Sequence, residues 1–365
     1  MYVALVCPYD LRRPGGVRSH IVGLGGALTE RGHRVDVIAP SATERIDSLD
    51  VIECGRSRGI TFGGTQIDLT WAEWSRVATV TARGYDVMHF HTIWNPLVPF
   101  QLAAGFRGPK VATFHDVPGR ATPRLAAAMM GPMSELLRRL WLRRVIAVSP
   151  AVGSYLSDGR YQVIPNGITV PAPLPAEGER RGLLYVGRLE PRKDVASLLR
   201  AVALLGDAAP PLTIAGDGYL RPDLERLAGS LGLRKVTFMG EVNETDKWRL
   251  LRDAAVLIAP SITGESFGIV LLEALAAGAI PIAADNPGYR DVLRDRRDDL
   301  LYRAGDAEAL AQRIRAVMAS DALRQSLRAW GDATWPAYDW RQLAVQVERV
   351  YRDAIGSEQE HSAPG

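Results

Sequence analysis

The chain has 365 residues, of which 47% are hydrophobic and 23% charged, with a formal net charge of +3. This composition indicates a globular protein of two domains and excludes a disordered or fibrous chain. No apolar run approaches the ~18–20 residues of a membrane-spanning helix. The cysteines Cys7 and Cys54 lack metal-site spacing, and the first residues lack a basic leader, so we expect a reducing cytoplasmic location.

The first half alternates short β-rich runs with amphipathic stretches. The runs are 2–7, 34–40, 86–91, 110–115, 144–149 and 161–165. This alternation is typical of βα units on a parallel sheet, and it predicts a Rossmann-like first domain over residues 1–168. Residues 169–182 are rich in Pro, Ala and Gly without periodicity, which predicts a linker.

The same alternation then restarts in the second half. The runs are 183–187, 211–216, 236–240, 254–260 and 280–284, which predict a second doubly wound domain over 183–337. Ligands of such sheets bind at the carboxyl ends of the strands, so we expect the two domains to face a cleft. A helical stretch follows over 338–356, and we expect the tail 357–365 to be disordered.

The loop after the first strand, PYDLRRPGGVRSH at 8–20, is a candidate ligand loop. Gly15 and Gly16 let backbone amides approach a ligand, and the helix expected from about Val17 presents its positive end there. The run GLGG at 23–26 falls inside this helix. Glycines at that place favour close packing of the helix on the sheet over dinucleotide binding.

Histidines lie near two strand ends in the first half. His89 and His91 alternate with Phe90, so they face the same side of a strand. A metal pair is one interpretation, but further ligands at suitable spacing are lacking. His115 ends the run KVATFH and is the better functional candidate, while Asp116 beside it either orients substrate or starts a turn.

The stretch 122–144 combines Met, Leu and Trp with arginines and predicts an amphipathic helix, interrupted near 131–132. The arginines are Arg138, Arg139, Arg143 and Arg144. Residues 1–175 hold 19 Lys and Arg against 13 Asp and Glu. These charges favour contact with an anionic membrane surface; the alternative is a core helix with an Arg-rich solvent face.

Two cations lie on the loop that opens the second domain, VGRLEPRKD at 186–194. Arg188 and Lys193 follow its first strand and come to the carboxyl end of the sheet. Two positive side chains on one loop suit a diphosphate, because its charge must be neutralised.

The segment GESFGIVLLEALAAG at 264–278 carries two carboxylates around an apolar helical pattern. A helix beginning near Ser266 or Phe267 would point free amides at a ligand. Glu265 precedes it, and Glu273 lies about two turns further on, so the two acids suit opposite ends of an extended ligand. The alternative is a helix cap at Glu265 and a surface salt bridge at Glu273.

These motifs resemble glycosyltransferase family 4, the retaining enzymes of the GT-B fold. The resemblance covers nearly the whole chain and includes PGGVRSH, FHD, IPNG at 164–167, GRLEPRK, GDG at 216–218, the two glutamates and the closing YDW at 338–340. Within the family, residues 7–40 look most like bacterial phosphatidylinositol mannosyltransferases. The resemblance implies that the C-terminal helix returns to the first domain.

The resemblance also implies roles for single residues. Arg188 and Lys193 would hold the donor diphosphate with the backbone of Gly15 and Gly16. Glu273 would bind the ribose, Glu265 the transferred sugar, and His115 would sit at the reacting face. The other implied donor contacts are Gly216, Glu241, Val242, Ser266, Phe267, Gly268 and Ile269.

By the same resemblance we expect a metal-independent transferase that needs no cofactor. It would move a hexose, with mannose and GDP-mannose favoured over UDP-sugars, to a lipid-linked or glycan acceptor. The alternatives are a sugar-nucleotide epimerase of the same fold and a non-catalytic nucleotide-sugar-binding subunit. Nucleic-acid binding finds no support, and the oligomeric state is left open. The chain departs from the family at Asp194, where glycine is usual, and at Ile168 and Thr169 after IPNG.

Overall fold

The computed structural model describes residues 1–11, 15–40, 45–46, 48–62, 65–93, 97–115, 124–154, 156, 160–171 and 180–362. At 45, 58–62, 65–69, 124–131 and 357–362 the description covers the backbone alone. The chain divides into two compact units. Unit 1 comprises Met1–Thr169 and Asp339–Gly365, and unit 2 comprises Val170–Tyr338.

Within the described residues, unit 1 is built on an eight-stranded sheet in the order β10-β9-β8-β7-β1-β2-β4-β3. The strands are β1 (Tyr2–Val6), β2 (Arg34–Ala39), β3 (Arg45–Ile46), β4 (Leu49–Glu53), β7 (Val87–His91), β8 (Lys110–Phe114), β9 (Arg144–Ala147) and β10 (Gln162–Val163). Every neighbouring pair is parallel except β3 and β4. The chain order reverses between β1 and β7, which makes this the topological switch point of the sheet.

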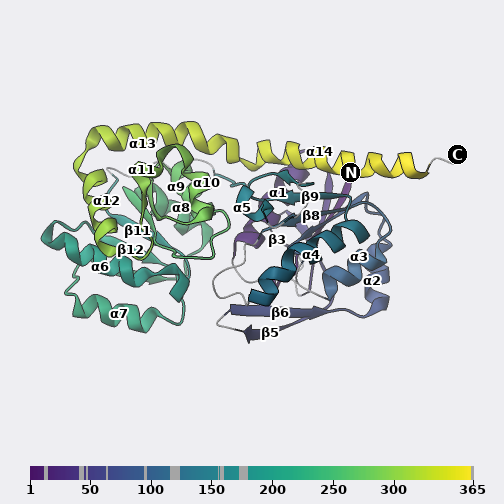
Figure 1. The fold of residues 1–365 in the computed structure, drawn as a ribbon, viewed down its shortest axis with the longest axis horizontal. Helices are drawn as coiled ribbons and strands as arrows, with labels where there is room; N and C mark the ends of the chain where they lie inside the picture. Colours follow the sequence, from purple (N-terminus) through teal and green to yellow (C-terminus); the bar gives the residue numbers. More distant parts are fainter. Residues whose placement is uncertain are drawn as a thin grey trace. The chain divides into compact units, whose positions relative to one another are not determined.

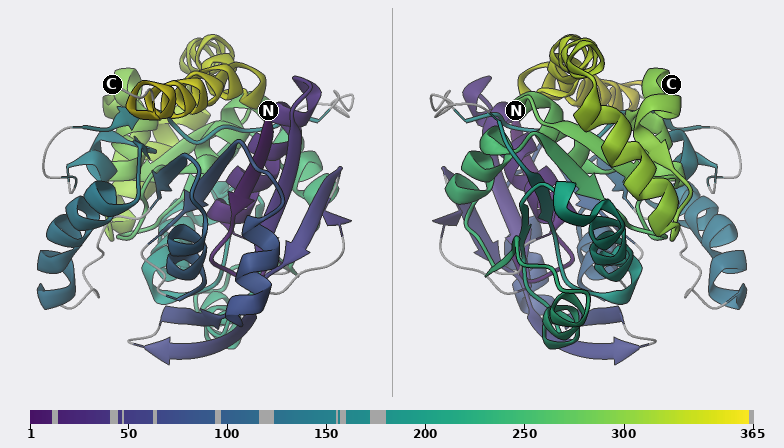
Figure 2. Two further views of the ribbon diagram at one scale, coloured as in Figure 1. Left: turned by 90° about the vertical axis from the view of Figure 1, so that its right-hand side faces the viewer. Right: turned by 90° about the vertical axis from the view of Figure 1, so that its left-hand side faces the viewer.

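Helices connect and cover these strands (Figures 1 and 2). They are α1 (Gly16–Glu30), α2 (Trp74–Thr81), α3 (Val98–Gly105), α4 (Arg124–Leu140), α5 (Pro150–Gly153) and α14 (Trp340–Ser362). A separate antiparallel hairpin of β5 (Arg56–Phe62) and β6 (Thr65–Trp71) is drawn in blue-violet at the bottom of Figure 2.

Two hydrophobic cores cover the two faces of this sheet. Along β1, Val3 and Leu5 belong to one core, and Ala4 and Val6 belong to the other. Successive strand residues face opposite sides, and both sides are covered, so β1 is apolar throughout. This explains why the parallel strands read as continuous apolar runs in the sequence.

The C-terminal helix α14 packs on unit 1 against α1 and the strands β7, β8 and β9. Its first residue, Trp340, is buried, and a methyl group at Gly23 or Gly167 would collide with the indole ring. Gly23 therefore serves close packing, as the sequence predicts for the GLGG run. The backbone of α14 is described to Ser362, and the disorder expected for the tail 357–365 stays a prediction.

Within the described residues, unit 2 has a six-stranded parallel sheet in the order β13-β12-β11-β14-β15-β16. The strands are β11 (Leu183–Val186), β12 (Leu212–Ala215), β13 (Val236–Gly240), β14 (Val256–Ala259), β15 (Ile280–Ala284) and β16 (Leu301–Tyr302). This is the doubly wound order, with its switch point between β11 and β14. The two sheets and the helix α14 confirm the predicted α/β architecture.

The helices of unit 2 follow its strands in turn. They are η1 (Pro191–Lys193), α6 (Val195–Leu205), η2 (Gly206–Ala208), α7 (Arg221–Ser230), α8 (Glu244–Asp253), α9 (Ile269–Ala277), α10 (Pro287–Val292), η3 (Arg294–Arg296), α11 (Arg297–Leu300), α12 (Ala307–Ala319), α13 (Asp321–Thr334) and η4 (Trp335–Tyr338). The helix α9 is predominantly apolar and buries most of its residues, including Leu271, Leu272 and Leu275.

Candidate active site

The candidate donor-binding residues of unit 2 lie at the switch point of its sheet. The loop after β11 carries Arg188 and Lys193, and the loop after β14 carries Glu265. The strands β11 and β14 are neighbours at the switch point, and ligands of doubly wound sheets generally bind at the carboxyl ends of such strands. The sheet order therefore brings together residues that lie more than seventy positions apart in the sequence.

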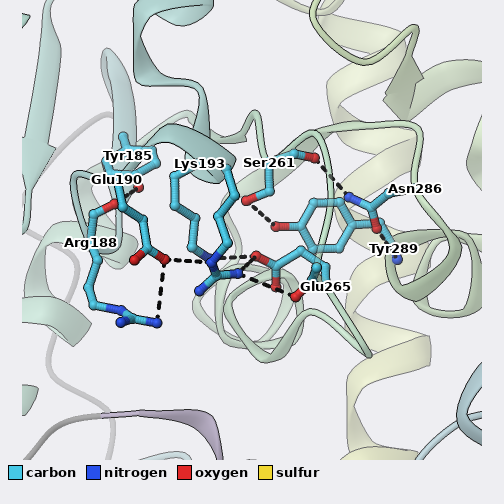
Figure 3. A network of polar contacts seen from close by, with 10 residues as sticks. Tyr185, Arg188, Glu190, Lys193, Ser261, Glu265, Asn286 and Tyr289 are labelled. Carbon is cyan, nitrogen blue, oxygen red and sulfur yellow. Dashed lines mark hydrogen bonds and ion pairs between the residues drawn. The ribbon is translucent and has the colours of Figure 1, made fainter. Parts of the chain in front are cut away.

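Five charged side chains join these two loops in one network (Figure 3). Lys193 Nζ lies 2.5 Å from Glu265 Oε1, and Arg192 lies 3.3 Å from the same oxygen. Arg192 also pairs with Glu190 at 2.5 Å. Arg188 reaches Glu190 at 3.4 Å, but its side chain is 65% exposed. Arg188 is thus the cation most open to a ligand, while Lys193 fixes the carboxylate of Glu265.

Hydrogen bonds to the loop after β11 and to Asn286 and Tyr289 hold the Glu265 loop in place. The Ile262 amide donates to the Arg192 carbonyl at 2.9 Å, which ties the two loops together. The Tyr289 hydroxyl donates to Ser261 Oγ, and the Asn286 amide donates to the Ser261 carbonyl (Figure 3). These side chains are buried, so the loop rests on a rigid support.

Asp194 explains one departure from the family pattern. Its backbone is left-handed, with φ of 47°, and its side chain accepts a hydrogen bond from the Ser197 amide at the start of α6. Glycine adopts this conformation most readily, but Asp and Asn tolerate it better than most residues. Asp194 therefore keeps the turn and adds a helix cap.

Glu273 lies in the second turn of α9 and is 9% exposed. The helix begins at Ile269, later than the start predicted near Ser266 or Phe267, because Gly268 turns the chain with φ of 94°. A side chain at Gly268 would collide with Tyr289. Phe267 is buried and lies 5.9 Å, ring to ring, from Tyr338.

Lys247 is the partner of Glu273 that sequence reasoning missed. Its Nζ donates to Glu273 at 2.7 Å and lies 2.8 Å from Glu244. Burial raises the pKa of Glu273 even though Lys247 opposes the shift. Burial lowers the pKa of Lys247, but the charges of Glu273 and Glu244 together raise it by more, so the net shift of the Lys247 pKa is upward. Glu273 is thus a buried ion-pair partner and not a surface residue.

A sequence signal for Lys247 does exist, because it lies in the first turn of the helix that follows the strand end MGEV at 239–242. In this strand end Glu241 is exposed and Val242 half-buried. Gly216 and Gly218 pack directly on the loop after β11, where a side chain at either would collide with the carbonyl of Gly187 or Leu189. Packing therefore accounts for the GDG motif, and a ligand role for Gly216 stays a prediction.

Histidines form a second cluster, at the carboxyl ends of β7 and β8 in unit 1. His91 Nδ1 lies 3.1 Å from His115 Nε2, and the His20 ring lies 4.5 Å from the His115 ring. All three side chains are buried. Burial lowers the pKa of His20 to about 4 and those of His91 and His115 well below the ordinary value, so the rings are neutral near pH 7.

His20 is the member of this cluster that the sequence did not single out, although it ends the motif PGGVRSH. His89 shares the strand face of His91, as predicted, with ring centres 4.3 Å apart. Both His89 nitrogens are engaged, by the Tyr351 hydroxyl and by Thr113, each at 2.7 Å. The metal pair of His89 and His91 therefore finds no support, because His89 has no free nitrogen.

The glycine loop of unit 1 is only partly described. Gly15 precedes α1, which begins at Gly16, and a methyl group at Gly15 would meet nothing within 4 Å. Packing therefore gives no reason for glycine at 15. Asp116 lies outside the described residues.

The helix α4 runs through Pro132 without the predicted interruption. Arg138 and Arg139 both pair with Glu135, at 2.7 and 2.5 Å, and they lower the pKa of that carboxyl to about 2. Leu136 and Leu140 remain 48% and 61% exposed. Among the described residues, no helix has the length and apolarity needed to cross a membrane.

Two doubly wound units, with cations and carboxylates gathered at the switch point of the second, define a class: GT-B proteins that bind a nucleotide-linked, polyhydroxyl ligand. Comparisons with known proteins give the family. Residues 14–170 match the model described as Glycosyltransferase Family 4, and residues 169–333 match Glycosyl transferases group 1. The chain belongs to glycosyltransferase family 4 and is a retaining hexosyltransferase that uses a nucleotide sugar.

The relatives extend over the full length. The phosphatidyl-myo-inositol mannosyltransferase of Mycobacterium leprae is 34% identical, over 98% of each chain. The sucrose-phosphate synthase of Thermosynechococcus elongatus has a TM-score of 0.72 at 22% identity, covering 97% of this chain and 99% of its own. Anabaena HepE, solved with UDP and glucose, has a TM-score of 0.75 at 18% identity, covering 96% and 99%. These two structures support the fold.

Proposed function

We propose that the protein is a mannosyltransferase that moves mannose from GDP-mannose, with retention, to a hydroxyl of a lipid-linked or glycan acceptor. The observation that carries this proposal is the 34% identity, over 98% of the chain, to a phosphatidyl-myo-inositol mannosyltransferase. Phosphatidylinositol is accordingly the first acceptor to test.

Unit 2 supplies the donor site in this proposal. Arg188 and Lys193 neutralise the diphosphate, and the exposure of Arg188 leaves its guanidinium available for a bidentate contact. Glu273 accepts hydrogen bonds from the ribose, and Lys247 keeps that buried carboxylate compensated. Glu265 accepts hydrogen bonds from the sugar hydroxyls and is held for this task by Lys193.

The choice of base is supported by Glu244, whose side chain is 69% exposed and shares Lys247 with Glu273. A carboxylate beside Glu273, the proposed ribose contact, can accept hydrogen bonds from both the ring N–H and the amino group of guanine. Uracil offers no such neighbouring pair of donors. Glu241 and Val242 at the same strand end complete the proposed base contact.

The proposed chemistry proceeds on one face of the sugar. The bond from the anomeric carbon to the diphosphate oxygen breaks, and the acceptor oxygen attacks from the same side. The departing phosphate oxygen takes the proton of the acceptor hydroxyl. Arg188 and Lys193 stabilise the negative charge that develops on the diphosphate. Such electrostatic stabilisation of the transition state is usually the largest contribution to catalysis. His115, held neutral by burial, donates or accepts one hydrogen bond to the transferred sugar.

A lipid acceptor requires contact with a membrane, and we propose that the protein associates peripherally with the cytoplasmic face. The support comes from unit 1. Leu136 and Leu140 are exposed on α4, with Arg139 between them. Apolar side chains interleaved with arginines suit an anionic interface.

The test begins with thermal shift measurements against GDP, UDP and their sugar conjugates. We expect GDP-mannose to raise the melting temperature most. Transfer of labelled mannose is then measured with phosphatidylinositol, with a soluble mannoside and with no acceptor. Product without acceptor would indicate an epimerase or hydrolase, binding without any product would indicate a non-catalytic subunit, and stabilisation by UDP-sugars alone would refute the donor assignment.

A further inference from the structure

His20, His91 and His115 bring three imidazoles together in unit 1. Their ring centres lie 4.5 to 5.4 Å apart in each pair. Each side chain offers a nitrogen within 4.8 Å of a nitrogen from the other two. The residues come from α1, the end of β7 and the residue after β8, so the switch point of the sheet creates the cluster.

A hydrogen bond fixes which nitrogen of His20 carries the lone pair. His20 Nδ1 lies 2.8 Å from Asn166 Oδ1, which can only accept, so Nδ1 is protonated and Nε2 presents a lone pair. His91 Nδ1 bonds to His115 Nε2. The Nε2 atoms of His20 and His91 are both buried without a hydrogen-bond partner among the described residues.

Unpartnered buried nitrogens are costly, and a neutral imidazole with one nitrogen tied to an oxygen acceptor is the usual state of a metal ligand. We propose that His20, His91 and His115 form a binding site for a transition metal ion, with Zn²⁺ as the ion of choice. The ligand set is three imidazoles without a carboxylate, which suits Zn²⁺ and excludes Mg²⁺ and Ca²⁺.

The geometry needs little rearrangement. With Zn–N bonds of about 2.0–2.1 Å in a tetrahedral site, ligand nitrogens lie roughly 3.3 Å apart. Rotations about the side-chain bonds bring atoms within 4.8 Å to that separation. Asn166 then acts behind His20 as a positioning residue, because its oxygen holds the imidazole in the ligand tautomer.

The metal site has a consequence for transfer, and this consequence rests on the role proposed above for His115. A metal-bound His115 loses the lone pair or proton with which it contacts the sugar. Zn²⁺ therefore inhibits transfer reversibly, and the metal is no part of the catalytic cycle.

Metal binding is measured directly on tag-free, chelator-treated full-length protein. Calorimetry with Zn²⁺ should give one site, and Co²⁺ should produce the visible absorption bands of a tetrahedral nitrogen site. His20→Gln and His91→Gln should each weaken binding at least 100-fold. Asn166→Ala, which keeps all three ligands, should weaken it about 10- to 100-fold. His33→Gln, a change at a half-buried histidine outside the cluster, should bind like the wild type.

Several outcomes would overturn the site: no binding by the wild type, an octahedral Co²⁺ spectrum, or binding that survives His20→Gln and His91→Gln. Melting curves in chelator show whether these variants fold; if they do not, Asn166→Ala alone decides, and unchanged affinity in that variant refutes the site. Zn²⁺ that binds as expected without inhibiting transfer would leave the site standing and refute the role of His115.

Discussion

Replacing Glu273 by glutamine should raise the Michaelis constant for the nucleotide sugar by roughly 10- to 150-fold with a smaller change in turnover. The amide keeps the volume and one acceptor oxygen of the carboxylate but loses its charge. A hydrogen bond to a charged group contributes about 1.5–3 kcal/mol. With about 1.4 kcal/mol for each factor of ten, this loss gives the stated range.

The same substitution should change stability less than a typical broken buried ion pair, which costs about 3–5 kcal/mol. Lys247 keeps Glu244 as a partner at 2.8 Å, so its charge stays compensated. Burial also raises the pKa of Glu273, so its ionised form is disfavoured in the fold. Ionised Glu273 therefore lowers the free energy of unfolding at pH values above its folded-state pKa, and this destabilisation is relieved as the pH falls through that pKa. The free energy of unfolding of Glu273→Gln should lack this pH dependence.

Steady-state kinetics with GDP-mannose as the varied substrate checks the assignment, and Glu265→Gln is the informative comparison. Because Glu265 is proposed to contact the moving sugar, its variant should lose turnover more than donor affinity. Glu225→Gln, an exposed change on α7, serves as the control. An unchanged Michaelis constant in Glu273→Gln would refute the ribose role, and opposite effects in the two variants would mean that the roles are exchanged.

Three further predictions follow from the contacts. Arg188→Ala and Lys193→Ala should weaken binding of the free nucleoside diphosphate in calorimetry, with Arg200→Ala as the matched control. Lys193→Ala should also lower turnover, because Glu265 loses its partner at 2.5 Å. Burial depresses the pKa values of His20, His89, His91 and His115, so their contribution to stability is present above pH ~6.5 and is lost as the pH falls. Denaturant unfolding in chelator should show this loss between about pH 6.5 and 4, and a flat profile would contradict it. Salt should release the protein from anionic vesicles, and replacing Arg138, Arg139, Arg143 and Arg144 by Gln should weaken this binding. The loss should be smaller than the ~1 kcal/mol per arginine expected of free cations, because Glu135 pairs with two of the four. Binding that ignores lipid charge would refute this mechanism.

The sequence by itself determined the architecture and which loops carry the candidate donor-binding residues. Apolar runs buried on both faces are characteristic of parallel strands, and they located most strands of both sheets. The strands β3, β4 and β16, at or beside the edges of the sheets, were not predicted. Motifs that follow such strands must lie at the carboxyl edge of the sheet. Arg188, Lys193 and Glu265 could therefore be assigned to one site before any contact was known.

Only the tertiary structure decided which side chains meet. Lys247 and Glu273 are 26 positions apart on different helices, and the place of Lys247 after the strand end MGEV does not by itself pair it with Glu273. His20 joins His91 and His115 because α1 leaves the sheet at the strand next to β7. The start of α9 at Ile269 depends on the left-handed turn of Gly268 against Tyr289. Pairings of this kind follow from strand order and packing across the fold, and local residue patterns do not encode them.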